Sequence, residues 1–316
     1  MIKLLYACDL HGSELCFKKF LSASSIYHAD ALILGGDLAG KGIVPIIQQR
    51  NSTYSSNFLG KTHRAKTEKE IQTLEERIRQ TGFYAHRMTE EEAEAANDDP
   101  LKQDELFHDC IVAGILRWVD LAERRLPDTA QFFWIPGNDD PDYITAPMTS
   151  SNRLIMCDDQ VVVIRDLFEM VSLGYSNRTP FNSPRELDEP DMREKLRALT
   201  EKLSYPGKSI FNLHCPPVSS GLDRVPKLTD DLRVDMSYGD QSMTDAGSVA
   251  VREYIELLQP MLALHGHCHE SRGKAMLGGT LCLNPGSDYA TGVLRAVIVD
   301  IDEQGFSIKN HQFISG

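Results

Sequence analysis

Seven polar side chains of the kind that bind metal ions follow short apolar runs in this sequence. Two pairs, Asp9 with His11 and His267 with His269, are each separated by a single residue. In extended chain that spacing directs both side chains of a pair to one face. Carboxylate, imidazole and amide groups without a required thiolate form a ligand set suited to Mn, Fe, Zn or Ni. The full set is Asp9, His11, Asp37, Asn138, His214, His267 and His269.

The order of these motifs along the chain is more specific than any one of them. Asp-x-His and Gly-Gly-Asp occur widely, and a lone histidine is more often a hydrogen-bonded core residue than a ligand. Here DLH, GGD, PGND, LHCPP and GHCH follow one another, each directly after a predicted strand. Ligand sites in α/β proteins form beyond the carboxyl ends of strands. We therefore expect the seven side chains to meet at one end of the fold.

Short apolar runs bounded by turn residues predict the strands that would position these motifs. The first 37 residues read as a β-α-β unit, with strands at 2–7 and 31–34 and a helix at 14–22. Further strands are predicted at 131–135, 161–164, 168–173, 209–213, 261–265, 280–283, 296–300 and 306–310, and helices at 191–203 and 248–258. Strands that return without long helices between them predict a second sheet facing the first.

The segment from 45 to 127 is longer than a crossover connection requires. Helical spacing is found at 66–79 and 101–125, and the acidic stretch TEEEAEAANDDP at 89–100 reads as a solvated connector. We expect a helical insertion at 45–127, a lid or an oligomer contact, within a single domain that spans 1–316.

The motif series resembles that of the calcineurin-like metallophosphoesterases, DxH…GD…GNH…H…GHxH. The tail GHCHESRG…NPGS is similar to a branch of predicted phosphoesterases related to a cyclic-AMP phosphodiesterase. This resemblance implies an α/β fold, a four-layer α-β-β-α sandwich with two facing mixed sheets. It also implies two divalent metal ions, Mn²⁺, Fe, Zn²⁺ or Ni²⁺. By position, Asp9, His11, Asp37 and His269 would hold one ion and Asp37, Asn138, His214 and His267 the other.

The implied activity is hydrolysis of a small phosphate ester by a hydroxide that bridges the two metals. The residues carried over as catalytic are Asp37, Asn138, Asp139 and His214. The family usually has His after Gly-Asn as the proposed acid for the leaving oxygen, and this sequence has Asp139. An aspartate beside two cations stays ionised and is a poor proton donor. We therefore favour phosphodiesters over monoesters, and the group that protonates the leaving oxygen is left open.

Two other functions compete with this interpretation. The stretch from Gly35 to Lys41 fits the GxxxxGK pattern of a P-loop NTPase. Position 42 is Gly, however, where the magnesium-binding Ser or Thr would stand, and Asp37 would repel a nucleotide's phosphates. The departure at Asp139 also allows a non-catalytic protein that keeps the metal-binding fold as a scaffold.

The net charge of the chain argues against one class of binding partner. The chain has 33 Lys and Arg against 46 Asp and Glu, a formal net charge of −13. Such a surface repels nucleic-acid phosphates, which argues against an extended nucleic acid as partner. Without an apolar run of about 18 residues or a secretory signal, we expect a cytoplasmic protein that does not enter the membrane. The seven cysteines form no CxxC pair, so we expect no disulfide framework. Whether the protein forms a homo-oligomer is left open.

Smaller expectations concern the neighbours of the motifs. Cys8 and Cys268 alternate with ligand positions and should point into the core. His265 is either a hydrogen-bond donor to a ligand or a structural residue. Asp140, followed by proline, reads as a helix N-cap. The stretch 218–247 follows His214, and we expect it to border the substrate, with Arg224 and Lys227 near a phosphate.

Overall fold

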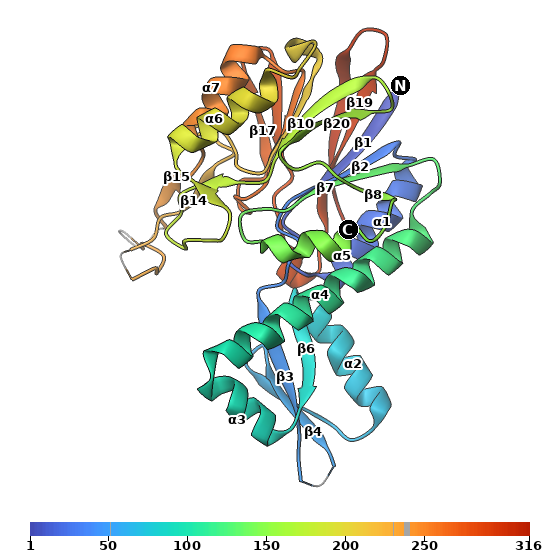
Figure 1. The fold of residues 1–316 in the computed structure, drawn as a ribbon, viewed down its shortest axis with the longest axis vertical. Helices are drawn as coiled ribbons and strands as arrows, with labels where there is room; N and C mark the ends of the chain where they lie inside the picture. The colour runs from blue at the N-terminus through green and yellow to red at the C-terminus, as the bar shows by residue number, and fades with distance from the viewer. Residues whose placement is uncertain (51, 230, 237–240) are drawn as a thin grey trace.

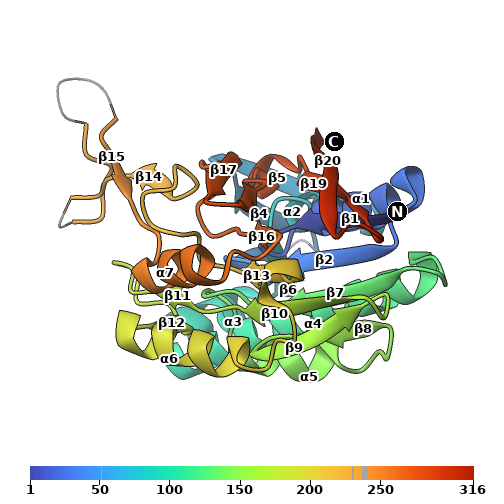
Figure 2. The same ribbon diagram turned by 90° about the horizontal axis from the view of Figure 1, so that it is seen from above.

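Two six-stranded mixed sheets face each other in the protein (Figures 1 and 2). The structure is a computed structural model that describes residues 1–50, 52–229, 231–236 and 241–316. The first sheet has the order β20 (Ser307–Ser315), β19 (Arg295–Asp302), β1 (Ile2–Ala7), β2 (Ala31–Gly35), β7 (Gln131–Ile135) and β8 (Leu154–Met156). The second has the order β17 (Gly273–Leu277), β18 (Thr280–Asn284), β16 (Leu262–Leu264), β13 (Ile210–Leu213), β10 (Phe168–Leu173) and β9 (Gln160–Ile164).

The central strands of each sheet are parallel. In the first sheet β1 pairs with β2 and β2 with β7, and in the second β13 pairs with both β10 and β16. Antiparallel partners lie toward the edges, β19 beside β1, β9 beside β10 and β17 beside β18. Parallel neighbours end at the same edge of a sheet, so the segments that follow them gather there.

Three apolar layers hold the sandwich together. Side chains alternate along a strand, and β1 shows the result: Leu4 and Tyr6 pack between the sheets, whereas Leu5 and Ala7 face the helices. Helices α1 (Glu14–Tyr27), α4 (Pro100–Arg125) and α5 (Thr145–Met148) cover the outer face of the first sheet. Helices α6 (Glu189–Thr200) and α7 (Val249–Leu258) cover the second. The predicted four-layer α-β-β-α sandwich is confirmed.

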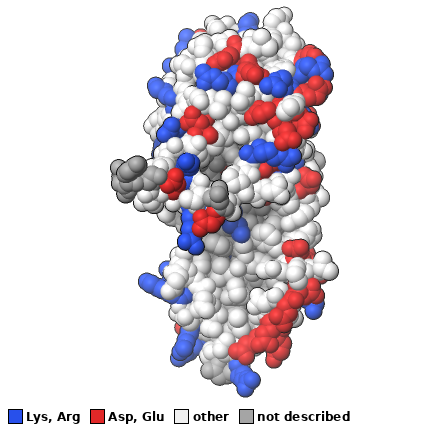
Figure 3. All heavy atoms as spheres, turned by 90° about the vertical axis from the view of Figure 1, so that its left-hand side faces the viewer, with Lys and Arg blue, Asp and Glu red and all other residues white. Residues whose placement is uncertain are grey.

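The insertion contains a sheet as well as helices, which corrects the prediction of a helical insertion. Its strands pair in the order β5 (Lys61–Ala65), β4 (Tyr54–Phe58), β3 (Gly42–Gln48) and β6 (Phe83–Met88), with α2 (Glu68–Arg79) packed against them. The acidic stretch read as a connector forms α3 (Glu90–Asp98), because Thr89 and Glu92 build a capping box at its start. Figure 3 shows a band of acidic side chains on this lower part of the molecule.

The boundaries expected for the insertion also differ from the structure. The strand β3 begins at Gly42, ahead of residue 45. At the other end, Ile111, Ile115 and Trp118 of α4 are buried in the layer that covers the first sheet. The indole of Trp118 stacks on the ring of Phe17, with centroids 4.3 Å apart. The second half of α4 therefore belongs to the sandwich, and the separate unit, here called the inserted unit, comprises residues 42–99.

The remaining described elements are short. They are η1 (Asp142–Ile144), β11 (Ser176–Asn177), β12 (Glu186–Leu187), η2 (Pro206–Lys208), β14 (Arg224–Pro226), β15 (Met243–Asp245) and η4 (Tyr289–Thr291).

All seven cysteines are buried free thiols. Within the described residues, none of the helices combines the length and the apolar character that crossing a bilayer requires. Part of the expected substrate-bordering stretch 218–247 lies outside the described residues.

Candidate metal centre

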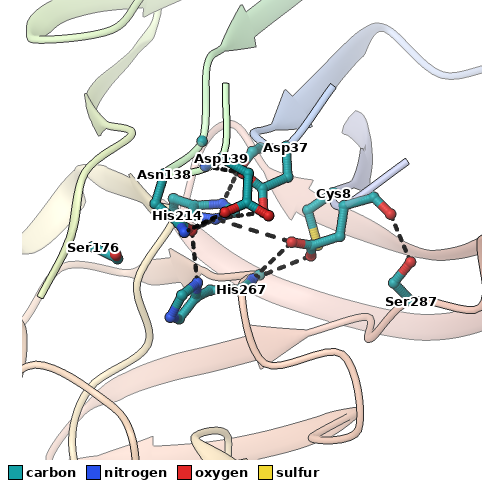
Figure 4. Close-up of polar contacts among 12 residues, drawn as sticks. Cys8, Asp37, Asn138, Asp139, Ser176, His214, His267 and Ser287 are labelled. Carbon is teal, nitrogen blue, oxygen red and sulfur yellow. Dashed lines mark hydrogen bonds and ion pairs between the residues drawn. The ribbon is translucent and has the colours of Figure 1, made fainter. Parts of the chain in front are cut away.

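The structure brings all seven predicted ligands together beyond the strand ends of the sandwich, and Figure 4 shows Asp37, Asn138, His214 and His267 among them. They come from the carboxyl ends of five strands: β1 supplies Asp9 and His11, β2 supplies Asp37, β7 supplies Asn138, β13 supplies His214, and β16 supplies His267 and His269. Six of these residues are buried or nearly so, and the side chain of His269 is 28% exposed. The two sheets thus converge on a single polar cluster.

The first group consists of the four residues that the resemblance assigns to one metal. One ligand atom from each of Asp9, His11, Asp37 and His269 lies within 4.8 Å of the others. The Nε2 atom of His11 is 3.1 Å from Nε2 of His269 and 3.5 Å from Oδ2 of Asp37. Nε2 of His269 is 3.6 Å from Oδ1 of Asp9. This is the spacing of ligand atoms around a common centre.

The second group is built around the amide oxygen of Asn138. That Oδ1 atom lies 3.0 Å from Nε2 of His214 and 2.7 Å from Nδ1 of His267. Nε2 of His214 is in turn 3.5 Å from Oδ2 of Asp37. Since the same Asp37 oxygen also faces His11 in the first group, Asp37 lies between the two groups.

The hydrogen bonds around His214 and Asn138 leave acceptor atoms facing each other. Nδ1 of His214 donates to the carbonyl of Gly35 at 2.8 Å, and Nδ2 of Asn138 donates to Asp139 at 3.0 Å. Once His214 is neutral, as a metal ligand must be, its Nε2 atom and Oδ1 of the amide are both acceptors. A cation between them satisfies both, and a backbone carbonyl that orients the other ring nitrogen is the usual companion of a ligating histidine. These residues therefore fit a divalent metal.

The two buried carboxylates attract positive charge to this site. Burial acts to raise the pKa of Asp37, but the positive charge of His214 outweighs it and keeps the carboxyl ionised. Burial would lower the pKa of His214, yet Asp37 and Asp9 raise it to about 10. Without a cation its imidazole is therefore protonated, and a bound metal ion would take the place of that proton. Burial lowers the pKa values of His11 and His267 to about 4, which leaves both imidazoles neutral at pH 7. Neutral imidazoles and ionised carboxylates are the protonation states that bind metals.

The backbone at the centre is strained. Asp9, His11, Asp37 and His267 have φ of 54°, 40°, 55° and 65°, a left-handed region that side chains other than glycine disfavour. Hydrogen bonds between loops hold this conformation: the amide of Asp9 donates to Gly36 O, and the amide of His11 to Asp37 O, both at 2.9 Å. Strain that the surroundings impose in this way clusters at functional sites.

Glycines in the motifs allow the loops to approach the ligands closely. A Cβ atom on Gly137 would lie 2.1 Å from Oδ1 of Asp37, and one on Gly266 would lie 2.7 Å from Oδ2 of Asp9. Such distances are shorter than any real carbon contact. The glycines of PGND and HGHCH are therefore required by the packing of the centre.

Asp140 has a different role from the predicted helix N-cap. Its buried carboxylate accepts hydrogen bonds from the amides of Leu38, Ala39 and Gly137, at 2.9, 2.7 and 2.8 Å. Burial, together with the charge of Asp37, raises the pKa of Asp140 to about 6. The expected N-cap is thus wrong: η1 begins at Asp142, and Asp140 instead ties the loop after β2 to the loop after β7.

The same hydrogen bonds contradict the P-loop interpretation. A phosphate-binding loop presents free backbone amides and continues into a helix. Here two of the loop amides, those of Leu38 and Ala39, are used by Asp140, and the chain continues into strand β3 at Gly42. The stretch from Gly35 to Lys41 is therefore not a nucleotide-binding loop.

The carboxylate of Asp139 is surrounded by donors that sequence reasoning missed. It forms an ion pair with Lys41, and it accepts a hydrogen bond from the hydroxyl of Ser183 at 2.7 Å. Its own backbone amide donates to Oδ1 of Asp37 at 3.0 Å. Asp139 therefore lies at the rim of the centre as half of a neutral pair. Lys41 had drawn attention only as part of the rejected P-loop pattern, and no sequence signal marks Ser183.

Two further side chains lie beside the ligands. The ring of Tyr289 lies 4.7 Å from that of His11 and 5.9 Å from that of His269, between centroids. Nδ1 of His265 donates to the carbonyls of Leu213 and Cys215, at 2.9 and 3.1 Å. Of its two predicted roles, His265 therefore has the structural one, because it holds the backbone on both sides of His214.

The cysteines beside the ligands are buried, as expected for side chains that point into the core. Cys8 and Cys268 are each 1% exposed, and the thiol of Cys8 contacts the carbonyl of His265. The two cations proposed for the substrate side have acidic neighbours instead. Arg224 pairs with Asp245 at 3.3 Å and Lys227 with Asp235 at 3.7 Å, so their contact with a phosphate stays a prediction.

Comparison with known proteins identifies one sequence relative and a shared fold. The chain is 30% identical to the uncharacterized protein MJ1162 of Methanocaldococcus jannaschii over 186 residues, which are 57% of this chain and 76% of MJ1162. A solved structure that is 17% identical aligns with a TM-score of 0.60 over 99% of this chain and 98% of its own. The crystal structure of TT1561 of Thermus thermophilus, 14% identical, aligns with a TM-score of 0.53 over 100% and 98%. No protein-family model matches the sequence.

Proposed function

The chain belongs to the family of MJ1162 and has the calcineurin-like metallophosphoesterase fold, and from that premise we propose that it is a metal-dependent phosphoesterase. The observation that carries the proposal is the convergence of seven nitrogen and oxygen ligands on two adjoining groups, with Asp37 between them. In this proposal each group holds one divalent ion.

The chemistry of the ligands supports hard or borderline divalent metals. Carboxylate, imidazole and amide donors suit Mn²⁺, Fe, Zn²⁺ or Ni²⁺. When bound, such ions polarise phosphoryl oxygens and supply hydroxide near neutral pH. The protein contributes Asp9 and Asp37 as the negative charges that retain the ions, and His214, oriented by the carbonyl of Gly35, as a fixed imidazole. Asn138 adds a ligand without adding charge, so the loaded site keeps a net attraction for an anionic phosphate ester.

We propose phosphodiesters with good leaving groups as the preferred substrates. The carboxylate of Asp139 accepts from Lys41, Ser183 and Asn138, which suits a positioning group rather than a proton donor. Esters whose leaving oxygen is already a stable anion do not need a proton at that position. The proposed active-site set remains Asp37, Asn138, Asp139 and His214, with Asp139 as a positioning residue.

The test combines metal analysis with a substrate screen. Protein stripped with a chelator and reloaded with Mn²⁺, Fe²⁺, Zn²⁺ or Ni²⁺ is examined by elemental analysis, and each form is offered aryl phosphodiesters and aryl phosphomonoesters. We expect two ions per chain and faster turnover of the diesters. A metal-loaded protein that hydrolyses none of these esters would favour the non-catalytic scaffold.

A further inference from the structure

Lys41 is fixed at the junction between the metal centre and the inserted unit. It follows Asp37 by four residues and directly precedes β3. Its backbone amide donates to the carbonyl of Gly82 at 3.1 Å, and the amide of Gly40 donates to the hydroxyl of Tyr84 at 2.7 Å. Both partners belong to the inserted unit, so this unit holds the backbone of Lys41 beside the centre.

The side chain of Lys41 is directed toward the metal centre by Asp139. One carboxylate oxygen of Asp139 pairs with the ammonium group, and the other accepts from Ser183 and Asn138. The backbone amide of Asp139 donates to Asp37, so the pair is linked to the residue that lies between the two ligand groups. This network gives the ammonium group a defined position.

Lys41 is more accessible to solvent than the buried carboxylate ligands. Its side chain is 37% exposed, whereas those of Asp9, His11 and Asp37 are at most 3% exposed. Throughout the described part of the chain, no other Lys or Arg forms an ion pair with a predicted ligand or with Asp139.

We propose that Lys41, positioned by Asp139, binds a non-bridging oxygen of the substrate's phosphate. This inference rests on the proposed function and names the substrate class more closely, as phosphate diesters in the monoanionic form. One oxygen of the monoanion faces the metals and the other faces Lys41. When Lys41 turns to the phosphate, Asp139 keeps Ser183 and Asn138 as donors and is not left unpaired. Lys41 thereby supplies the cationic contact at the position where the family usually has a histidine.

The experiment compares neutral and charged variants of Lys41 on the metal-loaded full chain. For Lys41→Met we expect the KM for an aryl phosphodiester and the inhibition constant of inorganic phosphate to rise together, by about 10- to 100-fold. Metal content by elemental analysis should not change. Lys41→Arg should recover most of the phosphate inhibition, because it restores the charge. Lys61→Met, an exposed lysine of β5, is the matched control for loss of one positive charge and should behave as the native protein.

Four other outcomes would each contradict a different part of this inference. Unchanged phosphate inhibition in Lys41→Met, with native activity present, would overturn the role of Lys41 alone. An equal loss in Lys61→Met would assign the effect to overall charge, and loss of metal in Lys41→Met would assign Lys41 to the centre's structure. Native protein that neither hydrolyses esters nor binds phosphate would instead overturn the proposed function. Should Lys41→Met fail to fold, Lys41→Gln carries the same expectation.

Discussion

The metal centre and the inserted unit are stabilised in different ways. At the centre, four of the seven predicted ligands have left-handed backbone, and polar groups such as Asp140 hold the loops together. The inserted unit has an apolar core of its own, which includes Ile46 and Ile78, and capping boxes begin both α2 and α3. The first region is an assembly of strained polar loops, and the second is an ordinary small α/β structure.

This difference shows which region depends on its surroundings. A left-handed non-glycine residue costs of the order of 1–3 kcal/mol, and two buried carboxylates repel each other. The centre therefore relies on the sandwich for its geometry, and the proposed metal ions would relieve the repulsion between the carboxylates. Substitutions at the centre should change metal content, whereas substitutions in the inserted unit should change stability and leave metal content as it is.

The largest effect is expected for Asp37→Asn. Removing a residue that only orients a ligand costs about 10- to 100-fold in metal affinity. Because Asp37 lies between both ligand groups, the variant should lose more metal affinity than that, and it should lose nearly all activity. Metal content and turnover of an aryl phosphodiester measure this. Asp166→Asn, at another left-handed aspartate with φ of 55°, is the matched control. Two retained metals with full turnover in Asp37→Asn would show that the assignment is wrong.

A second pair of variants compares the regions at glycines with different surroundings. Gly137→Ala places a Cβ against Asp37 and should cost about 1–3 kcal/mol by overpacking, with loss of metal. Gly60→Ala lies in the β4–β5 turn, with φ of 71° and no atom within 4 Å of the new Cβ. It should cost only the backbone strain of about 1–2 kcal/mol and keep its metal. Equal metal content in the two variants would contradict the close contact at Asp37.

The core of the inserted unit offers the converse test. Ile78→Ala removes a fully buried side chain and should destabilise the inserted unit by about 2–5 kcal/mol, while metal content stays native. Hydrogen exchange of the backbone amides in β3 and α2, measured at increasing denaturant concentration, would detect this loss of stability. Lys69→Ala, on an exposed position of α2, is the control. Metal loss in a folded Ile78→Ala protein would mean that the two regions are not independent.

The smallest effect is expected for Asp139→Ala on activated esters. Phenolate leaves without a proton, so turnover of aryl diesters by Asp139→Ala should stay within about tenfold of the native rate. Asp139→His should speed the hydrolysis of alkyl esters, because an imidazole that protonates the leaving oxygen contributes about 10²–10⁴-fold by general acid catalysis. Rates over a series of leaving groups give the comparison. Abolished turnover of aryl diesters with both metals bound would give Asp139 a direct catalytic role.

The sandwich and the convergence of the candidate ligands could be predicted because their signals are local. The strands 131–135 and 168–173 agree with the structure to the residue, since both are almost fully buried and consist mostly of apolar residues. Each ligand stands directly after such a run, and topology alone brings the runs together. Strands β4 and β5, YSSNF and KTHRA, lack that signal because their sequences are mostly polar and β5 is mostly exposed.

Contacts between distant loops could not be predicted. Asp140 meets Leu38 and Ala39 across about a hundred positions of sequence, and Lys41 meets Asp139 in the same way. These pairs depend on where two loops end in space, which no spacing within either loop encodes. Ser183 is an extreme case, because it stands in an irregular segment between β11 and β12.

The helix α4 connects the two regions mechanically. Its 26 residues form a rod of roughly 39 Å. Its first half lies against β3 and β6 of the inserted unit, and its second half is wedged against α1 by the stacking of Trp118 on Phe17. A force that pulls on the outer end of the inserted unit is therefore transmitted through α4 to the helical layer that covers the first sheet. The loop that carries Lys41 is a second connection, tied to the inserted unit at Gly82 and Tyr84, so the same pull would also reach the backbone of Lys41 beside the metal centre.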